Sequence, residues 1–197
     1  FVVRPDSLLA QWGIDTPVKD LFMDKEQTWW FVGARDELLR LQKGGRKVSV
    51  FLRDVSLGGD QLYDLGVLDG KLYLFYRSGL LVCRDLVSGR ELYRRERPDG
   101  LPAGHYGNTS YVVQGAHTFY QLCNGNAGGV MLNYDVDDRK WRLVMATDAW
   151  FNHLSIDRSG SIWVSGPEGL FNISSDLRKI QNLPFLKLVD GQRIDTE

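Results

Sequence analysis

Short apolar runs that alternate with polar, glycine-bearing turns form the main hydrophobic pattern of this chain, and residues 151–173 show it most clearly. Apolar residues occupy 154–156 and 162–164, with a polar turn between them. A Gly-Pro-Glu-Gly turn then leads into a third run that opens on Leu170 and Phe171. Runs of this length between glycine-bearing turns predict short antiparallel strands rather than a helix.

The same unit recurs three times earlier in the chain. Asp24 and Trp30 have the six-residue separation of Asp157 and Trp163. An aromatic residue takes the same position in all four copies, at steps of 43, 47 and 43 residues, as Trp30, Tyr73, Tyr120 and Trp163. A period of about 40–45 residues with four short strands per unit is typical of β-propeller blades.

We therefore predict an all-β chain with essentially no helix, built from four four-stranded antiparallel sheets in a single β-propeller-type domain over residues 1–197. Because complete propellers usually have more than four blades, a partial propeller or a fragment of a larger one is expected. The blades are placed at 14–52, 58–96, 107–146 and 150–182. Residues 1–4 are a candidate closing strand, and 183–197, with a strand at 185–189, either open a further blade or close the sheet.

The strand positions follow from the turns inside each unit. In the first two blades we place strands at 18–23, 28–32, 37–41, 47–51, 62–67, 71–76, 80–85 and 91–95. In the last two we place them at 111–114, 117–122, 130–135, 140–144, 153–157, 161–165, 170–174 and 178–181. Residues 124–129 are interpreted as a turn longer than its counterparts, and 97–106 as a Pro/Gly-rich connection between blades.

The fourth copy resembles the repeat of two-component-regulator propellers, which form the sensor regions of bacterial hybrid histidine kinases. The residues that carry the resemblance are Ile156, Asp157, Gly160, Ile162, Trp163, Val164, Gly169 and Leu170. Ser165-Gly166 stands where the repeat has Gly-Thr, and the second and third copies have Tyr in place of Trp. The resemblance implies a periplasmic, non-enzymatic module that recognises glycans or their breakdown products and signals through a membrane helix to a kinase.

Composition narrows the function classes. The net charge of −1 provides no basic surface for nucleic acid or for an anionic membrane. The sequence has no run of about 18 apolar residues, the length needed to span a bilayer. No signal peptide is visible. The first residue is Phe1, so a processed or excised piece of a longer protein is expected. Cys83 and Cys123 are interpreted as small buried hydrophobes, with a disulfide between them as the less favoured alternative.

The repeated residues have a structural explanation. Four copies of one aromatic position fit packing between blades better than a ligand site, and each Trp should find a partner for its indole N–H. Asp24 and Asp157 are expected to bond backbone N–H groups in their turns. No catalytic set, metal-ligand spacing or phosphate-binding glycine loop is evident, so no cofactor is predicted. The interleaved Arg and Glu residues of 84–97 fit a solvated outer strand.

Two connections are not explained by the repeat. One contains His105, Tyr106 and Asn108, and the other contains Trp150, Asn152 and His153. Aromatic and amide side chains at the loop ends of inner strands suit stacking on, and hydrogen bonding to, a polar ligand such as a sugar. These six residues are the candidate binding site. The competing interpretation is that Trp150 and Phe151 pack the loop.

Three functions remain open at this stage. The first is the sensor implied by the resemblance, with an oligosaccharide ligand. The second is a protein–protein scaffold, which would present a broad disc face rather than a single polar pocket. The third is a propeller hydrolase or lyase, for which convergent acid and base residues are missing. Under any of the three functions, further blades of the parent protein or a second copy are candidate partners, because an uncovered terminal blade exposes an apolar face.

Overall fold

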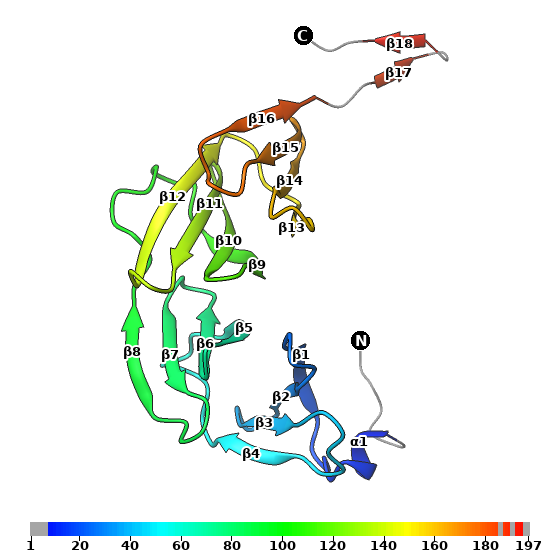
Figure 1. Cartoon of the computed structure of the whole chain (residues 1–197), viewed down its shortest axis with the longest axis vertical. Coiled ribbons are helices and arrows are strands. Elements are labelled where there is room, and N and C mark those ends of the chain that lie inside the picture. The colour runs from blue at the N-terminus through cyan, green and yellow to red at the C-terminus, as the bar shows by residue number, and fades with distance from the viewer. Residues whose placement is uncertain (1–7, 185–186, 190–191, 195–197) are drawn as a thin grey trace. The chain divides into compact units, whose positions relative to one another are not determined.

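The computed structural model describes residues 8–184, 187–189 and 192–194, which divide into two compact units between Glu96 and Arg97. Apart from one helical turn, α1 (Leu8–Gln11), the regular elements of these residues are β-strands. Four sheets have four antiparallel strands each, and the strands of each sheet neighbour one another in chain order (Figure 1). The predicted all-β class and the four four-stranded sheets are confirmed.

The first unit contains two of these sheets. The first sheet consists of β1 (Val18–Met23), β2 (Trp29–Gly33), β3 (Leu38–Leu41) and β4 (Ser49–Leu52), and the second of β5 (Leu62–Leu68), β6 (Lys71–Tyr76), β7 (Leu81–Asp85) and β8 (Glu91–Arg95). The first strand of each sheet has one register irregularity, which lies between Val18 and Asp20 in β1 and between Leu62 and Asp64 in β5. Asp20 and Asp64 therefore occupy equivalent positions.

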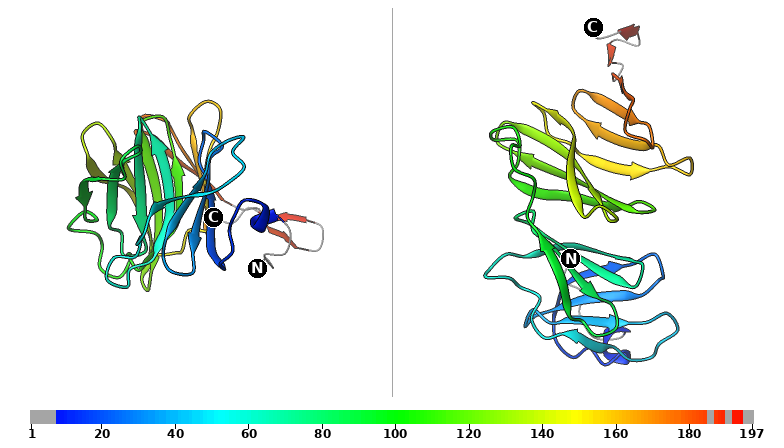
Figure 2. Two further views of the ribbon diagram at one scale, coloured as in Figure 1. Left: turned by 90° about the horizontal axis from the view of Figure 1, so that it is seen from below. Right: turned by 60° about the vertical axis from the view of Figure 1, so that its left-hand side comes forward.

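The second unit contains the other two sheets and a hairpin. The sheets consist of β9 (Asn108–Gln114), β10 (Thr118–Gly125), β11 (Gly128–Asp135) and β12 (Lys140–Thr147), and of β13 (His153–Ile156), β14 (Ile162–Gly166), β15 (Gly169–Ile173) and β16 (Ile180–Leu183). The hairpin pairs β17 (Lys187–Val189) with β18 (Gln192–Ile194). Strands within the sheets are visibly twisted (Figure 2), as antiparallel sheets generally are.

The long turn expected at 124–129 was wrong. Asn124 pairs with Gly129 and Gly125 pairs with Gly128, so both strands continue to a tip formed by Asn126 and Ala127. The glycines permit this extension because the hairpin end is crowded. A Cβ atom on Gly125 would overlap the carbonyl oxygen of Gly104.

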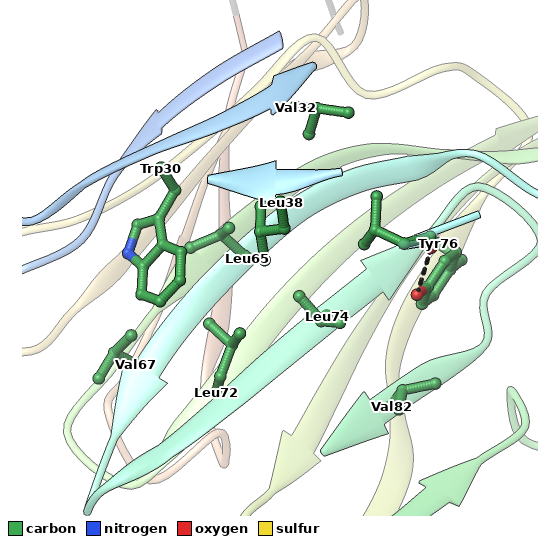
Figure 3. Packing of buried hydrophobic residues seen from close by; sticks show 10 residues of the cluster. Trp30, Val32, Leu38, Leu65, Val67, Leu72, Leu74, Tyr76 and Val82 are labelled. Carbon is green, nitrogen blue, oxygen red and sulfur yellow. Dashed lines mark hydrogen bonds between the residues drawn. The ribbon is translucent and has the colours of Figure 1, made fainter. Parts of the chain in front are cut away.

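The core of the first unit lies between its two sheets (Figure 3). Trp30 on the first sheet is fully buried against residues of the second sheet, and these are Leu65, Val67, Leu72, Leu74, Tyr76 and Val82. Alternate residues of β2, such as Phe31, lie on the opposite face and pack with Trp12 and Ile14 of the segment before β1. The hydroxyl of Tyr76 donates to the carbonyl oxygen of Val55 at 2.9 Å.

One aspartate side chain fulfils both predictions, because it bonds the backbone of its turn and also accepts the indole N–H of the Trp. Oδ1 of Asp24 accepts the backbone N–H groups of Glu26 (3.0 Å) and Thr28 (2.9 Å), and Oδ2 accepts the indole N–H of Trp30 at 2.8 Å. In the fourth blade, Oδ2 of Asp157 accepts the indole N–H of Trp163 at 2.9 Å. The six-residue separation therefore ties each turn to the strand that follows it.

The interpretation of Trp163 as buried core was wrong. Trp30, Tyr73 and Tyr120 are buried, and Tyr120 packs against blade-four residues such as Leu154 and Val164. Trp163 is only half-buried, because it alternates with Ile162 and Val164 and so lies on the other face of its sheet. Trp163 does not belong to the buried cluster that the third and fourth sheets share.

The strands predicted at the two ends of the chain lie only partly within the described residues. The closing strand expected at residues 1–4 lies outside the described residues, as do 185 and 186 of the strand expected at 185–189. Its remainder is β17, which pairs with β18 in a hairpin of its own. The hairpin agrees with the start of a further blade, which stays a prediction, as does the single-domain assignment.

Candidate functional site

The six candidate residues all belong to the second unit, at or near one end of its sheets. At this end β9 begins, β10 turns into β11, and β12 ends, as the pairs Asn108–Asn124 and Gly129–Thr147 show. The connection from β12 runs on through residues 148–152, and β13 begins at His153. In an antiparallel meander these points lie at the same edge by construction, which is why two connections 45 residues apart in sequence converge there.

Trp150 is the most exposed aromatic residue of this end. Its side chain is 58% exposed, yet its indole N–H donates to the carbonyl oxygen of Gly125 at 2.6 Å. Because this bond uses the only polar group of the indole, the ring can stack on a ligand but cannot offer it a hydrogen bond. The neighbouring Phe151 is 4% exposed. Phe151 therefore packs the loop, as the competing interpretation proposed, whereas the ring of Trp150 stays at the surface.

Asn124 positions this connection, and the sequence did not single it out. Its side-chain Nδ2 donates to the carbonyl oxygen of Phe151 at 2.9 Å, and its Oδ1 accepts the N–H of Phe151 at 3.0 Å. A Cβ on Gly129 would lie 2.7 Å from both Asn124 Oδ1 and the Phe151 ring. The glycine-rich stretch thus serves close packing around one amide clamp. The only sequence signal was an Asn among glycines, which resembles any turn.

The loop that contains His105 is bonded to the β10–β11 tip. The backbone N–H of Ala127 donates to the carbonyl oxygen of Gly104 at 2.8 Å, which attaches the loop to the tip. The Nε2 atom of His105 lies 3.5 Å from Oδ1 of Asp148, and the His and Asp side chains are 14% and 97% exposed. The His105–Asp148 pair and Trp150 thus contact or flank the same two-residue tip.

Tyr106 has a different environment from the other candidates. Its ring packs against the buried cluster of Cys123, Val130 and Leu132, and the guanidinium of Arg97 lies 4.3 Å from the ring centroid. Burial raises the pKa of Tyr106 above its usual range. It lines a concavity of about 300 Å³ under residues 97–104. Tyr106 therefore supports the connection rather than sharing the Trp150 surface.

The remaining three candidates are exposed and loosely arranged. The ring of His153 packs edge-on against Tyr111 at 4.8 Å between centroids. The backbone N–H of Asn152 donates to the carbonyl oxygen of Ser165 at 2.7 Å, which leaves its side chain at the surface. Asn108 begins β9 beside Asn124. These three residues lie around the end of the third and fourth sheets.

The first unit has an equivalent end, which the sequence did not mark. The connection into β5 is attached in the same way: the N–H of Val55 donates to the carbonyl oxygen of Asp36 at 2.7 Å, and the N–H of Arg77 to that of Gln61 at 3.0 Å. A cavity of about 560 Å³ lies at this end. Its lining includes Lys19, Asp36, Val55, Gln61 and Arg77. Its charged residues lie in three separate segments, at 19–20, 36 and 77, and gave no pattern that would have predicted it.

No family model matches the sequence, and no curated protein matches it. Solved structures do match the fold. The extracellular domain of BT4673 from B. thetaiotaomicron, described as a hybrid two component system, has a TM-score of 0.59 and 15% identity over 86% of this chain and 24% of its own. YCF48 from Cyanidioschyzon merolae has a TM-score of 0.61 and 15% identity over 86% and 59%. BamB from Moraxella catarrhalis has a TM-score of 0.55 and 12% identity over 85% and 49%.

These likenesses establish the architecture. The four sheets are blades of a β-propeller, of which the chain covers a part, and the chain spans about a quarter of the length of the BT4673 extracellular domain. No helix among the described residues has the length and apolar character to cross a membrane. The same residues contain no group of three or more His, Cys, Asp or Glu side chains placed to hold a metal ion.

Proposed function

We propose that the chain is part of an extracytoplasmic sensor propeller of a two-component signalling protein, and that its Trp150 surface contacts an oligosaccharide. The observation that carries the proposal is an indole that is fixed at its N–H yet 58% exposed. An exposed aromatic ring held in one orientation loses little freedom when a sugar ring stacks on it. Support for the signalling role comes from the repeat resemblance and from extracellular domains with the same fold.

The neighbouring polar groups suit hydroxyl recognition. Asp148 is almost fully exposed beside His105, and the side chains of Asn108 and Asn152 reach solvent at the same end. Carboxylates accept and amides both donate and accept hydrogen bonds, which matches the hydroxyl groups of a sugar. We expect this surface to bind a glycan without turnover, in line with the sensor role that the repeat resemblance implies.

Calorimetric titration of the chain with a panel of oligosaccharides tests this function. We expect one class of glycan to bind, Trp150→Ala to weaken that binding at least tenfold, and Trp150→Phe to retain most of it because a ring remains. Unchanged circular dichroism would show that both variants fold. Glycan turnover would instead support the hydrolase or lyase, and binding that ignores Trp150→Ala would contradict the proposed surface.

A scaffold function is the second candidate, and a separate observation favours it. Leu21, Met23 and Val50 are 48%, 56% and 58% exposed on the first sheet. Register places Met23 opposite Trp29 and Val50 opposite Leu39, so the three belong to the face that α1 and Trp12 cover only in part. Sedimentation at several concentrations separates self-association through this face from a monomer that binds glycan alone.

A further inference from the structure

The cavity of the first unit combines apolar walls with charges of both signs. Val32, Val55 and Leu62 contribute apolar surface, and the polar side chains at its edge are Lys19, Asp20, Asp36, Ser56, Gln61 and Arg77. Its volume of about 560 Å³ falls within the range of small-molecule sites, about 300–1,000 Å³. It is separate from the Trp150 surface, which belongs to the second unit.

Two of the four charges neutralise each other. The Nζ of Lys19 lies 2.6 Å from Oδ1 of Asp36. Hydrogen bonds from Lys19 and Ser56 lower the pKa of Asp36, so this carboxylate stays ionised and paired. The pair contributes little net charge to the cavity, and a ligand would gain little from displacing it.

The other two charged residues of the cavity, Arg77 and Asp20, form no ion pair with a described residue. No carboxylate lies within ion-pair distance of the Arg77 guanidinium in the part of the chain that the structure describes, and this group instead lies 5.4 Å from the centroid of the Tyr63 ring. Asp20 accepts the N–H of Leu21 at 3.0 Å through Oδ1 and forms no ion pair with any described residue. The cavity therefore has one cation and one anion free to pair with a ligand.

We infer that this cavity binds a small zwitterion of the amino-acid or short-peptide class, whose carboxylate pairs with Arg77 and whose ammonium pairs with Asp20. A guanidinium matches a carboxylate through two parallel hydrogen bonds, and the apolar wall accommodates an aliphatic side chain. An ammonium near Asp20 would also offset repulsion that already exists there, because the charge of Asp20 helps to raise the pKa of the equivalent Asp64. This site goes beyond the proposed glycan contact.

Titration calorimetry with the dipeptide alanylleucine tests the inference, with N-acetyl-alanylleucine and alanylleucine amide as probes that lack one charge each. We expect the dipeptide to bind and each modified probe to bind at least tenfold more weakly. Arg77→Gln should weaken the dipeptide and abolish the difference between dipeptide and amide. Asp20→Asn should weaken binding of the dipeptide and abolish the difference between the dipeptide and the acetylated probe. Arg53→Gln, which removes an exposed arginine outside the cavity lining, and Trp150→Ala should leave binding unchanged.

Several results would overturn the inference. Absence of heat with millimolar alanylleucine, or binding that both charge variants retain, would show that the cavity does not select a zwitterion. Glucuronate that binds through Arg77 with no effect of Asp20→Asn would identify an anionic sugar site and refute the ammonium contact. Both variants replace exposed side chains, and matching melting curves would establish that they fold.

Discussion

Trp30 and Trp163 occupy the same repeat position and make the same hydrogen bond, but their burial differs, so replacing each should have unequal effects. Trp30 is 0% exposed, and a large-to-small change in such a core costs about 3–5 kcal/mol. Trp30→Ala also removes the indole donor from Asp24, which is 7% exposed, and an unsatisfied buried acceptor costs about 1–3 kcal/mol more. We expect a total loss of about 4–8 kcal/mol in the free energy of unfolding.

Trp163→Ala should cost far less, about 1–2 kcal/mol. Its ring is half-buried, and Asp157 is exposed and can bind water when the indole is gone. Trp30→Phe and Trp163→Phe separate packing from hydrogen bonding, because phenylalanine retains a ring without the N–H. The first should cost about 1–3 kcal/mol and the second less than about 1 kcal/mol.

Urea denaturation followed by far-UV circular dichroism measures these differences. Since a loss of about 4–8 kcal/mol is a large part of the stability of a domain, we expect Trp30→Ala to yield little folded protein, and the comparison then rests on Trp30→Phe. Equal losses for the two phenylalanine variants would refute the reasoning, because they would mean that the Trp163 face is covered in solution as fully as the Trp30 face.

Three further outcomes follow from individual side chains. Burial raises the pKa of Asp64 to about 7, above the unfolded value of about 4, so its contribution favours folding at low pH and is lost as pH rises through 7. Asp64→Asn should therefore raise the unfolding free energy at pH 8, by up to about 4 kcal/mol, and leave it little changed at pH 4; the reverse order in urea titrations would contradict this. Asn124→Ala should cost about 1–3 kcal/mol through the two lost bonds to Phe151, and an unchanged urea midpoint would remove Asn124 from its positioning role. Burial raises the pKa of Cys123 to about 12, so a chromogenic disulfide reagent should label this free thiol only after unfolding, and rapid labelling of native protein would show that it is accessible.

The repeat made most of the architecture predictable. Strand positions such as Lys71–Tyr76 and Glu91–Arg95 agree with the sequence prediction because turn glycines and apolar runs act locally. The indole partners of Trp30 and Trp163 were predictable for the same reason, since the aspartate lies only six residues before each of them. The tip at 126–127 was missed because the crowding that requires its glycines comes from Gly104, over twenty residues earlier.

The candidate site was predictable only in part. Trp150 and His105 stand out in the sequence as polar or aromatic residues that the repeat does not need, and the fold brings both to the β10–β11 tip. Asn124 escaped notice because its role depends on the backbone of Phe151, 27 residues away. The sequence suggested that Tyr106 contacts a ligand, but its ring packs against the buried cluster that contains Cys123.

By itself, the sequence determined the number of sheets, the order of their strands and the aspartate–tryptophan turns, because hydrogen bonding between neighbours and side-chain alternation are local. The tertiary structure alone decided which copies of one repeated aromatic are buried, and which charges share a cavity. Trp30 and Trp163 share the aspartate turn and the indole hydrogen bond, but only Trp30 belongs to a buried cluster between two sheets. Arg77 and Asp20 face one cavity because two sheets pack together, and that proximity has no counterpart in the spacing of residues along the chain.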